Sequence, residues 1–212
     1  GTATKTYVDL RVSISPESAT NKVGDDHIFT VLVEQKVGVG AWTPVAAGVK
    51  PVVTVSPATT SKTDTCATTG TVGSTGACTV TINNSAAGVF TANASVTTTV
   101  ANGAQSVSIT RNTTGDTANA AALLLTPTRT GTATKTYVDL RISISPESAT
   151  NKVGDAHIFT VLVEQKVGDG AWTPVASGLK PTVTVSPATT SKTDACATTG
   201  TVGSTGACTV TI

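Results

Sequence analysis

The amino-acid sequence predicts an all-β protein built from tandem β-sandwich units, and three observations support this. The chain is rich in threonine and valine, which favour strands, and its 19 glycines and 9 prolines punctuate the sequence with turns. Charged residues make up only 13% of the 212 residues, and 39% are hydrophobic, which is unlike a disordered chain. Short alternating segments also recur along a long internal repeat.

The repeat determines the domain organisation. Residues 1–82 recur as residues 131–212, a period of 130 positions (131 − 1). Near identity over such a length indicates a recent tandem duplication, and the period is too long for a solenoid repeat. We therefore expect a complete unit over residues 1–130 and a second unit over residues 131–212 without its last strands. The copies differ at seven positions: Val12/Ile142, Asp26/Ala156, Val39/Asp169, Ala47/Ser177, Val49/Leu179, Val52/Thr182 and Thr65/Ala195.

The first two strands show the clearest alternation. Residues 8–14 alternate apolar and polar side chains and stop before Pro16, and residues 19–26 are rich in turn formers. Residues 27–35 follow as the second and most buried strand. The inward positions are Val8, Leu10, Val12 and Ile14 in the first strand and Phe29, Val31 and Val33 in the second.

The later strands complete the unit. Residues 49–55 and 77–82 alternate, and Asn102-Gly103 is a strong hairpin signal between two further alternating segments. A two-residue turn there would set Val96 opposite Ile109. About seven strands result, which is the pattern of an immunoglobulin-like sandwich. Residues 113–134 are expected to be a linker or a long connection, in which residues 120–125 form either one helical turn or a short strand.

Each unit contains two cysteines at the same spacing, Cys66 and Cys78 in the first and Cys196 and Cys208 in the second. Four cysteines allow three pairings, and the pairing within each unit is favoured because the pattern is complete in each copy. Free thiols or a metal pair are the alternatives. Disulfides would place the chain in an oxidising, extracellular compartment.

Few residues suggest a binding or catalytic site. His27 and His157 stand at equivalent strand starts, where a hydrogen bond to a turn is the simplest role. Trp42 and Trp172 could stack on a sugar, although capping the end of the sandwich is the more common role of such a ring. Asn21, Asp25 and Asp26 could contribute to a calcium site in the first unit only, because Ala156 replaces Asp26 in the copy. No lysine stands alone in an apolar run, so the sequence gives no indication of a lysine cross-link.

Composition excludes several classes of function. The formal net charge of +1 leaves no electrostatic footprint for nucleic acid, and no run of about 18 apolar residues is present for membrane insertion. Apart from the calcium and metal-pair alternatives given above, nothing in the sequence indicates an enzyme, a metal or a cofactor. Methionine is absent, which suggests an excerpt or a processed segment of a longer protein.

Three segments together resemble a known family. These are KTYVDLRVSISPESATNKVGDDHIFTVLVEQ, TPVAAGVKPVVTV and GSTGACTVTINNSAAGVFTANASVT. They look like bacterial immunoglobulin-like domains, the invasin/intimin-type tandem repeats of large cell-surface proteins. The resemblance implies a non-catalytic spacer, adhesin stalk or matrix repeat outside the cell, whose partners are neighbouring repeats of the same protein.

Two other functions remain open at this stage. A unit without its last strands leaves an open sheet edge, which could accept strands from another copy in a self-assembling filament. A carbohydrate-binding module would use Trp42 and Trp172.

Overall fold

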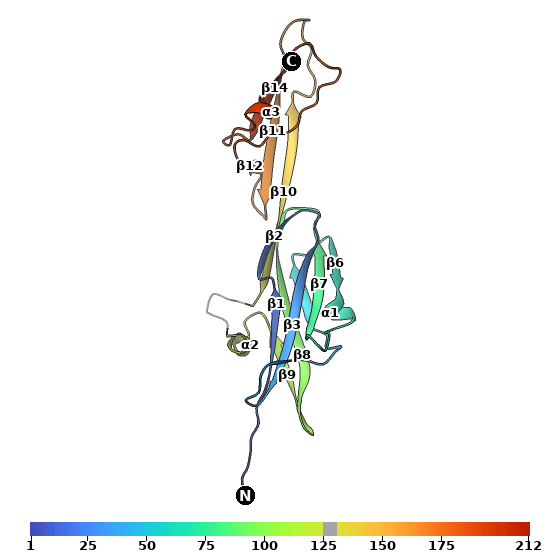
Figure 1. The fold of residues 1–212 in the computed structure, drawn as a ribbon, viewed down its shortest axis with the longest axis vertical. Coiled ribbons are helices and arrows are strands. Elements are labelled where there is room, and N and C mark those ends of the chain that lie inside the picture. Colours follow the sequence, from blue (N-terminus) through green and yellow to red (C-terminus); the bar gives the residue numbers. More distant parts are fainter. Residues whose placement is uncertain (125–130) are drawn as a thin grey trace. The chain divides into compact units, whose positions relative to one another are not determined.

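The computed structural model describes residues 1–124 and 131–212. The chain is mostly β, with two antiparallel sheets of five and nine strands and a few short helices (Figure 1). It divides into two compact units, unit 1 (Gly1–Tyr137) and unit 2 (Val138–Ile212). The division therefore falls a few residues beyond the sequence repeat, which starts again at Gly131.

The five-stranded sheet lies in unit 1 and contains the strands with the clearest sequence alternation. Its order is β1, β3, β7, β6, with β4 paired to β3. Every pairing is antiparallel, and Val12 in β1 stands opposite Val33 in β3. The strands are β1 (Val8–Ser15), β3 (His27–Val37), β4 (Thr43–Pro44), β6 (Ser61–Asp64) and β7 (Ala77–Asn83).

The second sheet contributes its own set of strands to unit 1. The long strand β8 pairs with β5 on one side and with both β9 and the first part of β10. Strand β2 pairs with β10. The strands are β2 (Ser18–Lys22), β5 (Val52–Ser56), β8 (Gly88–Asn102), β9 (Gln105–Asn112) and β10 (Ala133–Ser145).

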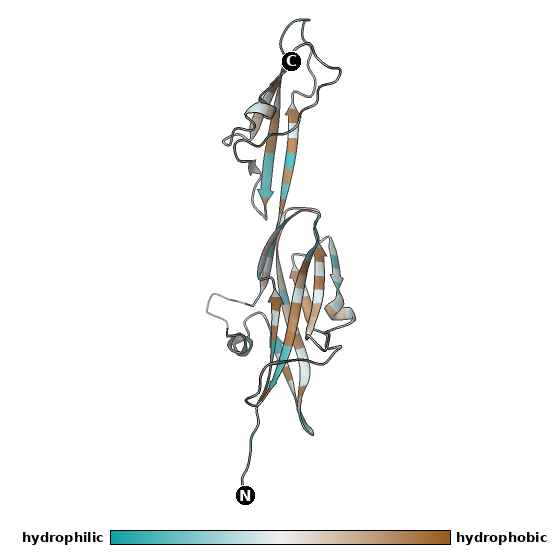
Figure 2. Cartoon of the chain, viewed as in Figure 1, coloured by the Kyte–Doolittle hydropathy of each residue, from teal (hydrophilic) through white to brown (hydrophobic). Residues whose placement is uncertain are grey.

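The core of unit 1 forms between these two layers. Apolar side chains of both sheets make one buried cluster, and the alternating brown and pale bands in Figure 2 show the period-two pattern that produces it. The inward positions expected for the first strands are confirmed. The fully buried members of the cluster are Leu10, Val12, Phe29, Val31, Val33, Cys66, Val80, Ile82, Ala92, Ala133 and Tyr137.

The segment expected as a linker belongs to unit 1, and part of it packs against β1. Residues 117–122 form helix α2 (Thr117–Ala122), with Asp116 as its N-cap. The buried side chain of Asn119 accepts from the Val12 amide at 2.8 Å and donates to the Val12 carbonyl at 2.9 Å, so it acts as a strand partner for the edge of β1. The helical alternative for residues 120–125 is thus confirmed over 120–122, whereas 125–130 lie outside the described residues.

Unit 2 repeats the five-stranded sheet only. Strand β10 pairs with β11 (Ile158–Val167), β11 with β12 (Thr173–Pro174) and β14 (Ala207–Thr211), and β14 with β13 (Thr193–Asp194). The register matches unit 1, because Val138 faces Val167 as Val8 faces Val37.

The described part of unit 2 is therefore one layer, and the expectation of a second, truncated sandwich is not confirmed. Leu140, Ile142 and Ile144 are 62%, 62% and 45% exposed, whereas their counterparts in β1 are buried. Residues 182–186, which match β5, form no strand. In unit 1 β5 pairs only with β8, and the second copy ends before a counterpart of β8.

Two further predictions need correction. The hairpin register is shifted by two residues, since Val96 faces Arg111 and Asn102 pairs with Gln105, which leaves Gly103 and Ala104 as the turn. A shift of two preserves the faces. Residues expected as a turn after Pro16 include β2, which forms because β10 supplies a partner strand from the second copy.

Candidate functional site: a strand of the second repeat in unit 1

The most distinctive site in the molecule is made by residues that belong to the second repeat in sequence but to unit 1 in structure. We call Ala133–Tyr137 the docking strand. It pairs antiparallel with β8, from Ala133 opposite Ala92 to Tyr137 opposite Gly88. Three of its side chains, Ala133, Lys135 and Tyr137, are fully buried. Unit 1 is therefore closed by the beginning of the next repeat.

Tyr137 anchors the docking strand at one end of the core. Its hydroxyl lies 3.1 Å from the carbonyl oxygens of Asp25 and Ile82, and its ring meets Phe90 edge to face at 5.8 Å. Burial, with the nearby charges of Asp26 and Asp25, raises the pKa of the phenol. The side chain therefore serves as a neutral hydrogen-bond donor in an apolar site.

Lys135 is the unusual member of the strand. Its ammonium donates to the side-chain oxygen of Asn21 in β2 and lies 5.1 Å from the centre of the Tyr137 ring. Burial lowers the pKa of Lys135 to about 8, and the charge of Asp25 partly opposes this shift. Among the described residues, no ion pair includes Lys135. The Lys135 ammonium therefore donates to a neutral amide oxygen, and its side chain is fully buried.

His27 lies beside this cluster. The ring is 8% exposed and packs edge-on against Phe29 at 4.6 Å. The expected hydrogen bond to a turn is absent at Nε2, which is buried and has no partner among the described residues. Burial, followed by the charge of Lys135, lowers the pKa of His27 to about 4. The imidazole is therefore neutral at physiological pH.

Unit 2 has an open site at the corresponding end of its sheet, and its described residues include no strand equivalent to β8 or to the docking strand. A cavity of about 710 Å³ opens there, lined by residues that match the contacts of the docking strand in unit 1. Asn151 corresponds to Asn21, and its amide donates to Ala156 at 3.2 Å as that of Asn21 donates to Asp26. The residues that line the cavity and match the docking-strand site of unit 1 are Asn151, Asp155, His157 and Ile212.

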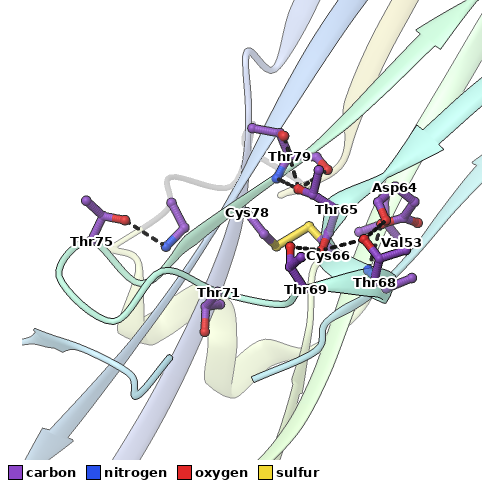
Figure 3. The surroundings of a disulfide bond; sticks show 12 residues. Val53, Asp64, Thr65, Cys66, Thr68, Thr69, Thr71, Thr75, Cys78 and Thr79 are labelled. Atoms are coloured by element: carbon purple, nitrogen blue, oxygen red, sulfur yellow. Dashed lines mark hydrogen bonds between the residues drawn. A yellow bond between two sulfur atoms is a disulfide. The ribbon is translucent and has the colours of Figure 1, made fainter. Parts of the chain in front are cut away.

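The cysteines form the two disulfides favoured by the spacing. Cys66 bonds to Cys78 and Cys196 to Cys208, each with Cα atoms 5.0 Å apart. Figure 3 shows that the first bond joins helix α1 (Thr65–Thr68) to β7. The carboxylate of Asp64 caps this helix by accepting from Ala67. Two structural disulfides indicate an oxidising environment.

The loop closed by this disulfide also depends on glycine. Gly70 and Gly76 have φ values of +75° and +67°, and a Cβ atom on Gly76 would lie 2.3 Å from the Val33 carbonyl oxygen. The same approach recurs at Gly206 against Val163. The spacing of the cysteine pair is thus built around a tight backbone contact that both copies share.

The tryptophans pack against charged side chains in the same way in both units. The guanidinium of Arg11 lies 4.5 Å from the centre of the half-buried Trp42 ring and is also bound to Glu34 at 2.7 Å. Arg141 covers Trp172 at the same distance. An arginine therefore covers each ring, Lys36 also lies over the Trp42 ring at 5.9 Å, and sugar stacking on either tryptophan stays a prediction.

The acidic side chains of the calcium candidate, Asp25 and Asp26, interact with other side chains of unit 1. Asp26 accepts from the Asn83 amide at 2.8 Å, and Asp25 lies 3.6 Å from the Lys22 ammonium. No cluster of three or more histidine, cysteine or acidic side chains suited to a metal occurs in the described part of the chain. Within residues 1–124 and 131–212, no helix is long and apolar enough to cross a membrane.

Sequence reasoning missed Lys135, Tyr137 and Asn21 as one cluster. The only available signal is the alternation of Ala133, Lys135 and Tyr137, and a lysine interrupts the apolar face that this pattern would otherwise predict. Comparison of the chain with family models, curated proteins and solved structures found no match.

Proposed function

We propose that the chain is part of a non-catalytic structural array of immunoglobulin-like β-sandwich repeats at the cell surface, as a stalk, adhesin or matrix fibre. The observation that carries the proposal is the docking strand. By sequence it opens the second repeat, yet its side chains fill the core of unit 1. A repeat that needs the start of the next repeat is suited to an array and poorly suited to separate domains.

Burial energetics favour this interpretation. Tyr137 is fully buried and makes two carbonyl contacts, and burial of an aromatic side chain is among the larger single contributions to a core. The next repeat therefore stabilises the previous one through specific contacts. An array that bears tension gains from such a design, because each connection is also part of a folded core.

Location outside the cell is supported by the two disulfides, which persist in oxidising compartments. The segments that resemble invasin/intimin-type repeats are consistent with a surface protein. The tight glycine turn recurs at Gly76 and Gly206, and each copy has its own disulfide, so each repeat would be stabilised by its own covalent bond.

Electron microscopy of the protein that contains these repeats tests the proposal. We expect beads of regular spacing along an extended chain on the cell surface. A compact globule, or labelling confined to the cytoplasm, would overturn it.

A self-assembling filament is the second candidate, and one observation favours it. Gly1–Tyr7 has the same sequence as Gly131–Tyr137, is exposed, and has a matching open cavity in unit 2. A second copy could insert this segment into that cavity by strand addition. Light scattering over a range of concentrations should then show association that Tyr7→Ala weakens, whereas a monomer at all concentrations argues against the filament.

A further inference from the structure

Lys135 presents a chemical problem that the rest of the core does not. A buried ammonium is costly unless a carboxylate or several hydrogen-bond acceptors compensate it. The side chain of Lys135 is fully buried, and the atom facing its amine is the amide oxygen of Asn21. Asp25, whose charge acts on Lys135, has a side chain that is 47% exposed, and its carboxylate lies 3.6 Å from the Lys22 ammonium.

The amide of Asn21 is held in one orientation. Its Nδ2 donates to the Asp26 carbonyl at 3.2 Å, which turns Oδ1 and the amide carbon towards Lys135. Strands β2 and β10 are paired, so the two side chains extend from neighbouring strands of the same sheet. A nucleophile and a carbonyl carbon thus meet at fixed positions, as intramolecular acyl transfer requires.

We propose that Lys135 and Asn21 are joined by an intramolecular isopeptide bond. The neutral amine of Lys135 attacks the side-chain amide carbon of Asn21, and an Nζ–Cγ bond forms. The Cγ–Nδ2 bond then breaks, and Nδ2 departs with an additional proton as ammonia. One amide replaces another, so the step needs no oxidant, reductant or external acyl donor.

The surroundings support each part of this step. Burial lowers the pKa of Lys135 to about 8, so a useful fraction of the side chain is the nucleophilic amine near neutral pH. His27 supplies a buried neutral base, because its Nε2 has no hydrogen-bond partner in the described residues. The charge of Lys135 acts on this imidazole, so His27 is the candidate to relay the proton from Nζ to the departing nitrogen.

The product also removes the electrostatic problem. An isopeptide bond has no charge, so the desolvation cost of the ammonium disappears. The bond would join a residue of one repeat to a residue of the next, since Asn21 belongs to the first copy and Lys135 to the second. The inference concerns a covalent bond within unit 1 and does not depend on where the protein is located or what it binds.

The sequence contains its own control. Lys5 has the same adjacent residues in the sequence as Lys135, but Lys5 is exposed and lies in no strand. Asn151 has the same amide orientation as Asn21, but the docking strand that would bring a lysine to it is absent from unit 2. We therefore expect one such bond in the chain, at Lys135 and not at Lys5.

Intact mass spectrometry of the reduced, denatured chain tests the inference. The expected mass is lower than the sequence mass by one ammonia, and tryptic digestion should yield the Lys135 and Asn21 peptides joined. The full sequence mass would overturn the proposal. So would an ammonia loss that maps elsewhere, for example to a succinimide at Asn102-Gly103, which loses the same mass.

Three variants sharpen the result. Lys135→Arg and Asn21→Ala should each restore the full mass, because each removes one reacting group, whereas Lys5→Arg should leave the ammonia loss unchanged. Because the wild-type mass alone decides the question, a variant that fails to fold does not obscure it. A cross-link found in a chain that electron microscopy shows as a compact globule would separate this inference from the proposed array.

Discussion

Tyr7 and Tyr137 show how strongly one residue can depend on context. They occupy the same position in the two copies, within the identical sequence GTATKTY. Tyr7 is 77% exposed, whereas Tyr137 is fully buried and bonded to backbone carbonyls. The difference arises because the residues before β1 have no partner strand, whereas the docking strand pairs with β8.

Tyr137→Ala should destabilise unit 1 by about 4 kcal/mol, because it removes a buried aromatic ring and leaves two carbonyl groups without their donor. Tyr7→Ala is the matched control and should change the free energy of unfolding by less than about 0.5 kcal/mol. Hydrogen exchange measured in unit 1 during denaturant unfolding separates the two. Equal effects of the two substitutions would contradict the assigned role of the docking strand.

His27 should make unit 1 sensitive to acid. Its pKa is about 4 in the folded chain and near 6.5 when unfolded, so between these values the unfolded state binds more protons. Stability is therefore fully present above about pH 6.5 and falls as the pH drops towards 4, by about 3 kcal/mol in total.

Unfolding of the wild type and of His27→Phe at several pH values measures this effect. Lys135, whose charge acts on the imidazole, is present in both proteins, so the difference between the two curves isolates His27. The variant should lose less stability than the wild type between pH 6.5 and 4. Parallel curves would show that the imidazole does not control the acid response.

At the scale of strands, the alternation of apolar and polar residues predicted those strands whose buried faces are set by their own sequence. Strands β1, β3 and β7 were predicted because Leu10, Phe29 and Val80 each lie in an alternating segment that packs on one core. The hairpin register was wrong by two residues, since Asn102-Gly103 indicates a turn without fixing which two residues form it.

The docking strand could not be predicted in the same way. Identical residues are exposed at 1–7 and buried at 133–137, so no local property of the sequence separates the two states. Whether this sequence is buried depends on its partner strand β8, which lies more than 30 residues before the docking strand in the chain. The strand β2 was missed for the same reason, because it forms by pairing with β10.

The disulfides should matter unequally in the two units. Each closes a loop with a sequence separation of 12, which corresponds to about 3 kcal/mol in the chain-entropy model. The core of unit 1 extends over two layers, whereas that of unit 2 contains little beyond Val161, Val163, Val175 and Val210 next to its cysteines. Unit 2 should unfold on reduction while unit 1 remains folded.

Hydrogen exchange with and without a reductant measures this for each unit separately. Replacing Cys196 and Cys208 by alanine should reproduce the loss of protection in unit 2, whereas replacing Cys66 and Cys78 should lower the stability of unit 1 without unfolding it. Retained protection of β14 after reduction would mean that the single sheet is stable without its staple.

At the scale of the whole molecule, the boundary of a folding unit differs from the boundary of the repeat. Residues 1–130 are one sequence repeat, whereas residues 8–137 are unit 1 (Gly1–Tyr137) without its exposed first seven residues. Since residues 1–7 and 131–137 are identical, these two polypeptides are circular permutants with the same composition. They therefore differ only in which end carries the docking sequence.

We expect the polypeptide 8–137 to be a stable monomer and the polypeptide 1–130 to be less stable by at least the effect of Tyr137→Ala.

The segment 1–7 precedes Val8, which pairs with Val37, whereas the docking site lies near the His27–Ile82 pair at the other end of β3. With a rise of about 3.3 Å per residue, β1 separates the two places by roughly 25 Å, and the segment would also have to reverse direction. The 1–130 polypeptide can recover the missing strand only from another molecule, so its stability should rise with protein concentration. Denaturant unfolding at two concentrations tests this, and equal, concentration-independent midpoints for both polypeptides would place the folding boundary at the sequence repeat instead.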